Sequence, residues 1–265
     1  MKLGVSTACF YGDIEVEDTI TLFNDVGIKH AEVFLNCPLE YKSEFIDELK
    51  KRKGALKIHS IHAHTSSFEP ELFSAHDRTR IDAEETFRAV CKAGFKLGAK
   101  YYTFHGPFLK VGRELDLNFD KFCARVNELC EIASSYGIYI AYENVNWAYG
   151  CKPEFFTELL SRCPLLKTTL DIKQALISNI DPVRFLEAMG DSLVTVHLCD
   201  IDKALQNPML PFKGRYNFEK FFKELKRVAK QEPTLLLEVY RGNFENIDEL
   251  KECYDKMQNL IESIN

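Results

Sequence analysis

Short apolar runs in this sequence repeatedly end in a side chain that can bind a metal ion or transfer a proton. These side chains are His62 and His64 in IHSIHAH, His105 in YYTFHGP, Glu143 in IYIAYEN, Asp171 in KTTLD, His197 in VTVHLCD and Glu238 in LLLEVY. Each run is short and apolar, which predicts a β-strand. Because six successive strands place the reactive side chain at or near the C-terminal end, the pattern predicts ligands that converge on one point and metal-dependent chemistry.

The elements that must position these side chains alternate along the whole chain. Strands are predicted at residues 3–8, 30–35, 57–63, 99–105, 138–143, 166–171, 193–199 and 234–239. Helices are predicted at 15–25, 43–52, 78–97, 120–135, 153–161 and 218–229, and two more open at 181–182 and near 245. Strict alternation requires parallel strands joined by crossover helices. Eight such units favour an α/β fold of the (β/α)8 TIM barrel type over an open doubly wound sheet.

Composition limits the classes of protein to consider. The 265 residues are 46% hydrophobic and 28% charged and contain no Pro/Gly/Ser-rich linker, so we expect one domain over residues 1–265. A net charge of −6 without a basic tail argues against a nucleic-acid partner. We expect no signal peptide, and no apolar run approaches the ~20 residues of a membrane span. Nine scattered cysteines without a CxxC pair predict reduced thiols and a cytoplasmic location.

Four of the reactive residues fall at equivalent positions on the last four predicted strands: Glu143, Asp171, His197 and Glu238. Alternate strand residues point into a barrel, whose active site lies at its C-terminal mouth. These strands therefore present three carboxylates and one imidazole to a shared point. We predict one divalent ion there, with Mn²⁺, Mg²⁺ or Co²⁺ suited and Zn²⁺ also compatible. The competing interpretation, satisfied core or rim groups, is disfavoured because carboxylates are rarely buried unpaired.

His62 and His105 form a second tier, on strands next to the one that ends in Glu143. They are predicted either to bind a second metal ion or to hold substrate hydroxyl groups. The alternative is that they only form structural hydrogen bonds at the rim. For His64 the functional and the structural interpretation are about equally supported. Glu32 is left undecided between a rim residue and one that orients a ligand. We assign no role to the remaining histidines, which are His30, His59 and His76.

The motifs SIHAH, TFHGP, AYENVNW, TLDIKQA, VHLCD, LPFKGRYNFEKFF and LLLEVY resemble those of the xylose isomerase-like TIM-barrel superfamily. The motifs occur in the same order as in that superfamily, and they cover nearly the whole chain. That superfamily includes tagatose- and psicose-type 3-epimerases, L-xylulose 5-phosphate 3-epimerases, hydroxypyruvate isomerases, inosose dehydratases and endonuclease IV. The resemblance therefore implies a metal-dependent isomerase or epimerase that acts on a small sugar or sugar phosphate. It leaves open whether the protein forms a homo-oligomer.

In the epimerase branch, the positions that match Glu143, Asp171, His197 and Glu238 bind one divalent cation. The resemblance also implies that Glu143 and Glu238 face the substrate carbon from opposite sides and are the catalytic residues. A metal ion that binds a ketone oxygen and a neighbouring hydroxyl stabilises an enediolate. One carboxylate on each face can then remove a proton and return one with inverted stereochemistry. If only one glutamate acts, the outcome is aldose–ketose isomerisation.

Departures from the family motifs define the alternatives. The family often has D-x-x-H on the sixth strand, whereas Gln174 stands at the histidine position here. Gln174 can hydrogen-bond a substrate hydroxyl but is a poor metal ligand. Lys203 can take the place of a basic residue that the epimerases have after strand 7. Endonuclease IV has an Asp-x-His pair for a third zinc where this chain has Leu210-Pro211-Phe212. An AP-endonuclease-like repair enzyme is therefore the weaker alternative, and a dehydratase on the same scaffold is not separated from an epimerase.

Residues beyond the strand ends are predicted to contact the substrate. Phe10 and Trp147 follow strands 1 and 5, where an apolar wall would stack on the CH face of a sugar. Lys213, Arg215 and Arg241 fall in the loops after strands 7 and 8, where barrels often bind phosphate. Surface charge without a ligand is the competing explanation for these three. Of them, Arg241 is taken as a candidate substrate-binding residue.

Overall fold

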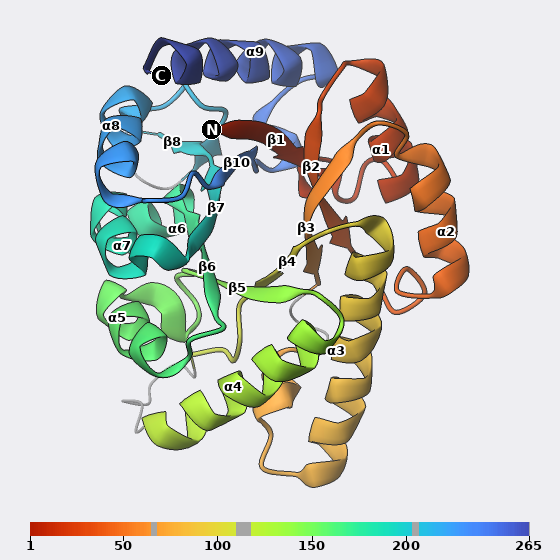
Figure 1. Cartoon of the computed structure of the whole chain (residues 1–265). Coiled ribbons are helices and arrows are strands. Elements are labelled where there is room, and N and C mark those ends of the chain that lie inside the picture. Colours follow the sequence, from red (N-terminus) through yellow and green to blue (C-terminus); the bar gives the residue numbers. More distant parts are fainter. Residues whose placement is uncertain (65–67, 110–117, 203–206, 265) are drawn as a thin grey trace.

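The predicted strands close into a parallel eight-stranded barrel surrounded by helices (Figure 1). This computed structural model describes residues 1–64, 68–109, 118–202 and 207–264. The barrel order is β1-β10-β7-β6-β5-β4-β3-β2. The strand bounds are β1 (Lys2–Ser6), β2 (His30–Leu35), β3 (Lys57–Ala63), β4 (Tyr101–Phe104), β5 (Tyr139–Glu143), β6 (Lys167–Asp171), β7 (Leu193–Leu198) and β10 (Thr234–Leu237). The predicted (β/α)8 barrel is confirmed, and every strand end with a reactive side chain opens at the same mouth.

Helices cover the outside of the barrel between successive strands (Figure 1). Their bounds are α1 (Val16–Asp25), α2 (Ser43–Arg52), α3 (Asp77–Leu97), α4 (Phe119–Ser135), α5 (Pro153–Arg162), α6 (Ile172–Ile177), α7 (Pro182–Met189), α8 (Phe218–Val228) and α9 (Ile247–Ile264). The starts of α7 and α8 are set by side-chain caps, since Asp181 accepts from Val183 N at 3.0 Å and Asn217 accepts from Lys220 N at 2.9 Å. No helix in the described part of the chain is both long and apolar enough to cross a bilayer.

Two local elements were not predicted from the sequence. Helix α6 follows β6 without a loop, and a short antiparallel pair, β8 (Asp200–Ile201) with β9 (Pro208–Met209), extends from the end of β7. A six-residue helix spans fewer than two turns, which is too short for a helical period to be recognised. Its start is instead determined by Asp171, whose Oδ1 accepts the backbone N–H of Gln174 at 2.9 Å.

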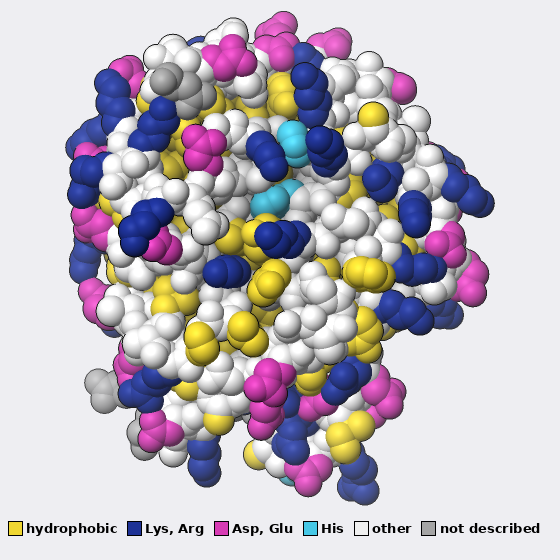
Figure 2. Space-filling view, viewed as in Figure 1, with side chains coloured by type: hydrophobic (Ala, Val, Ile, Leu, Met, Phe, Trp, Pro, Cys, Tyr) yellow, Lys and Arg dark blue, Asp and Glu magenta, His cyan; other side chains and the backbone are white. Residues whose placement is uncertain are grey.

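The N-terminal end of the barrel is basic. Figure 2 shows Lys, Arg and His side chains gathered over the ring of strands on this face. A hollow of about 450 Å³ there includes Lys2, His30, Lys57 and Lys100 in its lining. His59 also lines it, but its Nε2 lies 2.9 Å from Thr195 Oγ1 inside the barrel, and burial lowers the pKa of His59 to about 4. His30 and His59 are therefore at the opposite end of the strands from the other reactive residues.

Gly4 on β1 illustrates how tightly the strands pack. A Cβ on this residue would overlap the backbone carbonyl of His30 and lie 2.8 Å from Leu236 Cδ2. Because a backbone carbonyl cannot move aside cheaply, we expect Gly4→Ala to destabilise the fold by about 1–3 kcal/mol or more. Urea unfolding measures this difference, with Lys2→Ala on the exposed start of the same strand as the control. A change in the unfolding midpoint no larger than that of the control would contradict the close approach.

Candidate active site

A cavity of about 390 Å³ opens at the C-terminal mouth of the barrel. Its lining includes most of the residues that the sequence singled out: His62, His64, His105, Glu143, Trp147, Asp171, Gln174 and Glu238. Apolar and aromatic side chains complete the wall, among them Tyr11, Phe34 and Tyr240. A mostly apolar pocket with a few convergent polar groups is typical of a small-molecule site.

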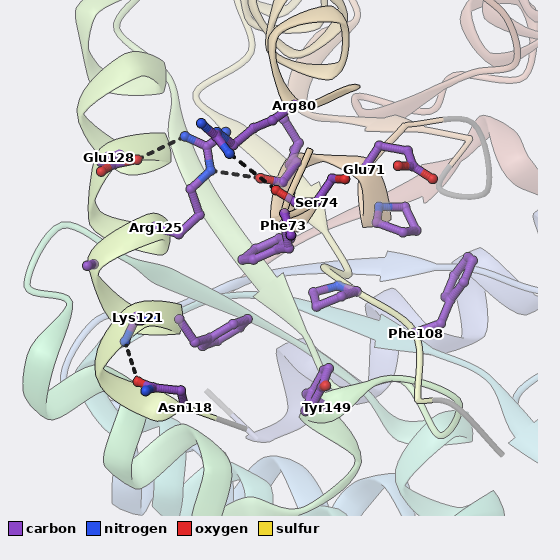
Figure 3. A pocket seen from close by; sticks show the side chains of 16 residues that line it. Glu71, Phe73, Ser74, Arg80, Phe108, Asn118, Lys121, Arg125, Glu128 and Tyr149 are labelled. Carbon is purple, nitrogen blue, oxygen red and sulfur yellow. Dashed lines mark hydrogen bonds and ion pairs between the residues drawn. The ribbon is translucent and has the colours of Figure 1, made fainter. Parts of the chain in front are cut away.

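A larger cavity, of about 960 Å³, lies outside the barrel mouth (Figure 3). Residues of η3 (Pro70–Phe73) line it together with Arg80 and Arg125. Arg125 is already engaged there, since it pairs with Glu128 and donates to Leu72 O. The groups of potential metal ligands that we find among the described residues all involve side chains at the barrel mouth. The smaller cavity is therefore the candidate active site.

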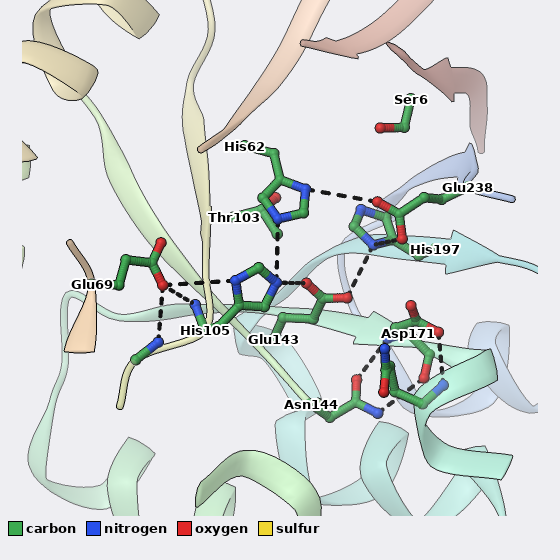
Figure 4. A network of polar contacts seen from close by, with 12 residues as sticks. Ser6, His62, Glu69, Thr103, His105, Glu143, Asn144, Asp171, His197 and Glu238 are labelled. Carbon is green, nitrogen blue, oxygen red and sulfur yellow. Dashed lines mark hydrogen bonds and ion pairs between the residues drawn. The ribbon is translucent and has the colours of Figure 1, made fainter. Parts of the chain in front are cut away.

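The four predicted metal ligands come together at this mouth (Figure 4). One ligand atom from each of Glu143, Asp171, His197 and Glu238 lies within 4.8 Å of the others. His197 Nδ1 is 3.2 Å from Glu143 Oε1 and 3.2 Å from Glu238 Oε2. All four side chains are buried. The register explains this meeting, because Asp171 pairs with His197 between β6 and β7 and Glu238 directly follows β10.

The arrangement fits a divalent cation. Asp171 Oδ2 is buried and accepts no hydrogen bond, and Lys173 Nζ forms an ion pair with it at 3.4 Å. A buried carboxylate oxygen without a hydrogen bond is costly, so a bound ion would satisfy it. Three carboxylates and one imidazole match the oxygen-rich ligand sets of Mn²⁺, Mg²⁺ and Co²⁺ and are acceptable to Zn²⁺.

The electrostatics of the cluster favour the charged form of the imidazoles. Burial opposes protonation of His197, but Glu238, Glu32 and Glu143 outweigh it and raise the pKa of His197 well above its usual range. Burial alone would raise the pKa of Glu143, whereas His197 and His105 lower that pKa to about 2. A ligating imidazole must be neutral, so a divalent cation competes with the proton on His197.

The pKa of Asp171 shifts in the opposite direction to that of Glu143. Burial raises the pKa of Asp171 to about 6, and repulsion from Glu143 and Glu238 adds to the rise against the attraction of Lys173. This is the direction expected for a carboxylate among other carboxylates. A divalent cation at the cluster would remove the repulsion and keep Asp171 ionised.

Glu32 on β2, whose role the sequence left undecided, lies beside His197. It is fully buried and accepts from Ser6 Oγ at 3.2 Å, Ser60 Oγ at 2.8 Å and Thr103 Oγ1 at 2.6 Å. Its Oε1 lies 3.3 Å from His197 Nε2, so the other ring nitrogen faces the carboxylate cluster. Outer carboxylates commonly orient metal-binding histidines in this way. The strand pattern pointed to Glu32, but only the barrel geometry brings it to His197.

His62 and His105 lie against Glu143 in the same cavity. Their Nε2 atoms are 3.2 Å apart, and His105 Nε2 is 2.9 Å from Glu143 Oε2. Burial opposes protonation of His62, but Glu238 and Glu32 raise its pKa to about 10. Ligand atoms of His62, His105 and Glu143 also meet within 4.8 Å. The structure is therefore compatible with a second metal ion and with direct contacts to a substrate.

Glu69, which the sequence did not single out, supports His105 from behind. This fully buried carboxylate accepts from Tyr102 Oη at 2.6 Å and from the backbone N–H groups of His105 at 2.8 Å and Gly106 at 3.1 Å. His105 Nδ1 is 3.7 Å from the same carboxylate. A single acidic residue in a loop has no sequence signal, since neither period nor motif marks it.

We expect Glu69→Ala to destabilise the fold by at least about 3 kcal/mol. The substitution leaves one hydroxyl and two backbone N–H groups without their acceptor, and each unsatisfied buried donor costs about 1–3 kcal/mol. Glu71→Ala, two residues further on and exposed, is the matched control. The free energy of unfolding in urea measures the difference. Equal values for the two variants would mean that Glu69 does not hold the β4 end in place.

Only some of the other residues that were predicted to contact the substrate line the cavity. Trp147 and Gln174 line it, with the Trp147 ring 5.3 Å from that of His105 and Gln174 Oε1 accepting from Asn146 N at 3.1 Å. Lys203 lies outside the described residues. Lys213 forms an ion pair with Glu249 instead of facing the cavity.

Phe10 and Arg241 are not among the described residues that line the cavity. The Phe10 ring is buried in the core against Phe23 and Phe244, because the turn η1 (Thr7–Phe10) directs it away from the mouth. Tyr11, the next residue, lines the cavity in its place. Arg241 is used in a loop contact, with Nε 2.5 Å from Asp13 Oδ2 and Nη1 donating to Phe244 O at 2.8 Å.

Comparisons with known proteins agree with this architecture. The chain is 25% identical to an uncharacterized protein of Methanocaldococcus jannaschii over 267 residues, which covers 98% of this chain and all of that protein. Its structure resembles D-psicose 3-epimerase from Clostridium cellulolyticum H10, crystallised with D-tagatose, with a TM-score of 0.81, 15% identity and coverage of 100% and 99% of the two chains. It also resembles the probable 3-DHS dehydratase of Bacillus anthracis, with a TM-score of 0.77, 16% identity and coverage of 98% and 99%.

The two solved structures are too distant in sequence to show more than the shared fold. A family model gives the assignment directly, since the model of the xylose isomerase-like TIM barrel matches residues 20–260. This match includes the ends of β3 to β7 and of β10, where the reactive side chains lie. With a closed parallel barrel and this match over most of its length, the chain belongs to the xylose isomerase-like TIM barrel family.

Proposed function

We propose that this protein is a divalent-metal-dependent isomerase or epimerase of a sugar or sugar phosphate. One observation supports this most directly: Glu143 and Glu238 reach the same buried cluster as Asp171 and His197, with ligand atoms within 4.8 Å. A site that only bound a sugar would not need a metal cluster that includes two glutamates. A D-psicose 3-epimerase shares this fold, which is consistent with the proposal, as does a probable 3-DHS dehydratase, while the particular reaction is our inference.

The two glutamates supply the proton transfer in this proposal. One carboxylate removes the hydrogen next to the substrate carbonyl as a proton, the C–H electron pair forms a C=C bond, and the carbonyl oxygen takes up the negative charge. The other, protonated carboxyl group returns a proton to the opposite face of the carbon. Glu143 and Glu238 approach His197 from β5 and from the end of β10, so they can stand on two sides of a substrate. A divalent ion held by the four side chains would stabilise the negative charge on the substrate oxygen.

The remaining cavity residues would bind and orient the sugar. Trp147, Tyr11 and Phe34 provide aromatic surface for a CH face, and Gln174 lies beside them with polar atoms for a hydroxyl. His62 and His105 can hold hydroxyl groups or a second ion. We further propose a small-molecule partner, no nucleic acid and a cytoplasmic location, in line with the net charge of −6 and nine free cysteines.

The test is hydrogen exchange on a panel of ketoses. Protein loaded with Mn²⁺ is incubated with D-fructose, D-psicose or D-tagatose in D₂O, and proton NMR follows the α-hydrogen and the products. We expect loss of the α-hydrogen signal with a new epimer or aldose, and only with metal present. An unsaturated product would instead identify a dehydratase. Cleavage of an abasic-site DNA duplex without any sugar turnover would favour the repair-enzyme alternative and reject the proposal.

A further inference from the structure

Lys173 is a buried cation that takes no part in the proton transfer proposed for the two glutamates. It is the second residue of α6, and its side chain is only 4% exposed. Its Nζ is 3.4 Å from Asp171 Oδ2, 3.7 Å from Glu238 Oε2 and 4.7 Å from the centre of the Tyr240 ring. Among the cavity-lining residues that the structure describes, Lys173 is the only lysine or arginine. The ammonium therefore lies at the edge of the ligand cluster, on a residue that lines the cavity.

The fold alone does not account for a lysine at this position. A cation in the first turn of a helix meets the positive end of the helix dipole, which is unfavourable. Lysine is also among the residues that are least often buried. Asp171 already uses Oδ1 to cap α6, so the helix start does not need Lys173. The contacts that stabilise the buried ammonium are instead with Asp171 and Glu238, two of the proposed metal ligands, which suggests a role in the chemistry of the cavity.

The charges around the cluster indicate what that role is. In the proposed reaction one of the two glutamates is protonated, so the ligand set carries two negative charges, and His197 as a neutral ligand contributes none. A divalent ion would balance these two charges, and Lys173 adds one positive charge beside them. A centre with a net positive charge can accept a new negative charge on a substrate oxygen more readily than a neutral or anionic one, because opposite charges attract strongly at low dielectric.

We propose that Lys173 is a catalytic residue that donates a hydrogen bond to the substrate oxygen on which negative charge develops. The proposal rests on the proposed function. As the C–H bond breaks, the proton passes to a glutamate, the electron pair forms the C=C bond, and the charge moves to the former carbonyl oxygen. Lys173 keeps its own proton throughout and stabilises that oxygen by its charge and one N–H donor.

The test separates this role from a structural one by replacing Lys173 with methionine, which keeps the length of the stem but removes the charge. Lys167→Met, at the opposite end of β6, is the matched control. Binding of Mn²⁺ is measured by titration calorimetry at low salt. We expect K173M to bind Mn²⁺ at least about 5-fold more tightly, because a repelling charge is removed. A lysine that only held the cluster together would give weaker Mn²⁺ binding on substitution, and that result would overturn the proposal.

A second measurement tests the contact with the substrate oxygen and does not require turnover. Oxalate, a planar dianion that resembles an enediolate, is titrated into the Mn²⁺-loaded proteins. We expect K173M to bind oxalate at least about 10-fold more weakly, since a charge-assisted hydrogen bond is lost, and Lys167→Met to stay within 2-fold of the parent protein. Unchanged oxalate affinity in K173M would overturn the contact. If the parent protein exchanges no ketose hydrogen, the proposed function fails, while these two affinities still decide the role of Lys173.

Discussion

Replacing Glu143 with glutamine should reduce the exchange of a ketose α-hydrogen with D₂O by about 10²–10⁴-fold, the usual contribution of a general base. Glutamine has nearly the same shape but cannot accept a proton at neutral pH. Its amide oxygen can still point at the metal position, so we expect Mn²⁺ to remain bound at least in part. NMR-detected exchange and calorimetric Mn²⁺ titration on the same preparation give both quantities.

Two further variants make this result specific. Glu154→Gln removes one exposed carboxylate from α5 and should leave exchange unchanged. Glu238→Gln should stop epimerisation, while the hydrogen of one epimer still exchanges through Glu143. If Glu143→Gln exchanges at the rate of the parent protein, the assigned acid–base role is wrong, whatever the metal content.

Removal of the divalent ion should lower the thermal stability of the protein as well as its activity. Ions that bind only the folded state stabilise it by about 2.7 kcal/mol at a concentration of 100 times Kd. For a chain of this size, that corresponds to a rise in Tm of about 5–10 °C. The physical reason is the repulsion among Glu143, Asp171 and Glu238, which a cation relieves. Differential scanning calorimetry of chelator-treated protein, with and without Mn²⁺, measures the shift.

Asp171→Asn provides the control for this stability effect. The amide keeps an oxygen that can cap α6 but removes one negative charge from the cluster. We therefore expect a smaller rise in Tm on addition of Mn²⁺ than in the parent protein. Identical Tm values for the parent protein with and without Mn²⁺, Co²⁺ or Zn²⁺ would contradict a metal site at the barrel mouth.

The sequence predicted the barrel because each strand and helix has a local signal of its own. Asp171 and His197 lie at the ends of apolar runs, and parallel register then brings such ends to one mouth. What the sequence could not predict depends on tertiary geometry. Glu32 reaches His197 from inside the barrel, and Glu69 reaches His105 from a loop. Lys173 became recognisable only when α6 was seen to begin directly after β6.

The position of the Phe10 ring in the core has a simple physical cause. Placing a side chain beyond a strand end requires the direction of the chain there, and a 3₁₀ turn over residues 7–10 changes that direction. An aromatic side chain was predicted at the mouth after the first strand, and Tyr11 lines the cavity there. Arg241 was assigned by loop position alone, and its contacts with Asp13 and Phe244 are visible only in three dimensions.

The two oxygens of Asp171 serve different neighbours, and this has a consequence for how the protein can change. Oδ1 starts a helix, whereas Oδ2 faces the other ligands. Lys173 and Gln174 belong to the turn that this carboxylate starts, so their positions depend on the residue that is also proposed to bind the ion. A substitution at residue 171 that removes the capping oxygen would therefore disturb both the proposed metal position and the turn that carries Lys173 and Gln174.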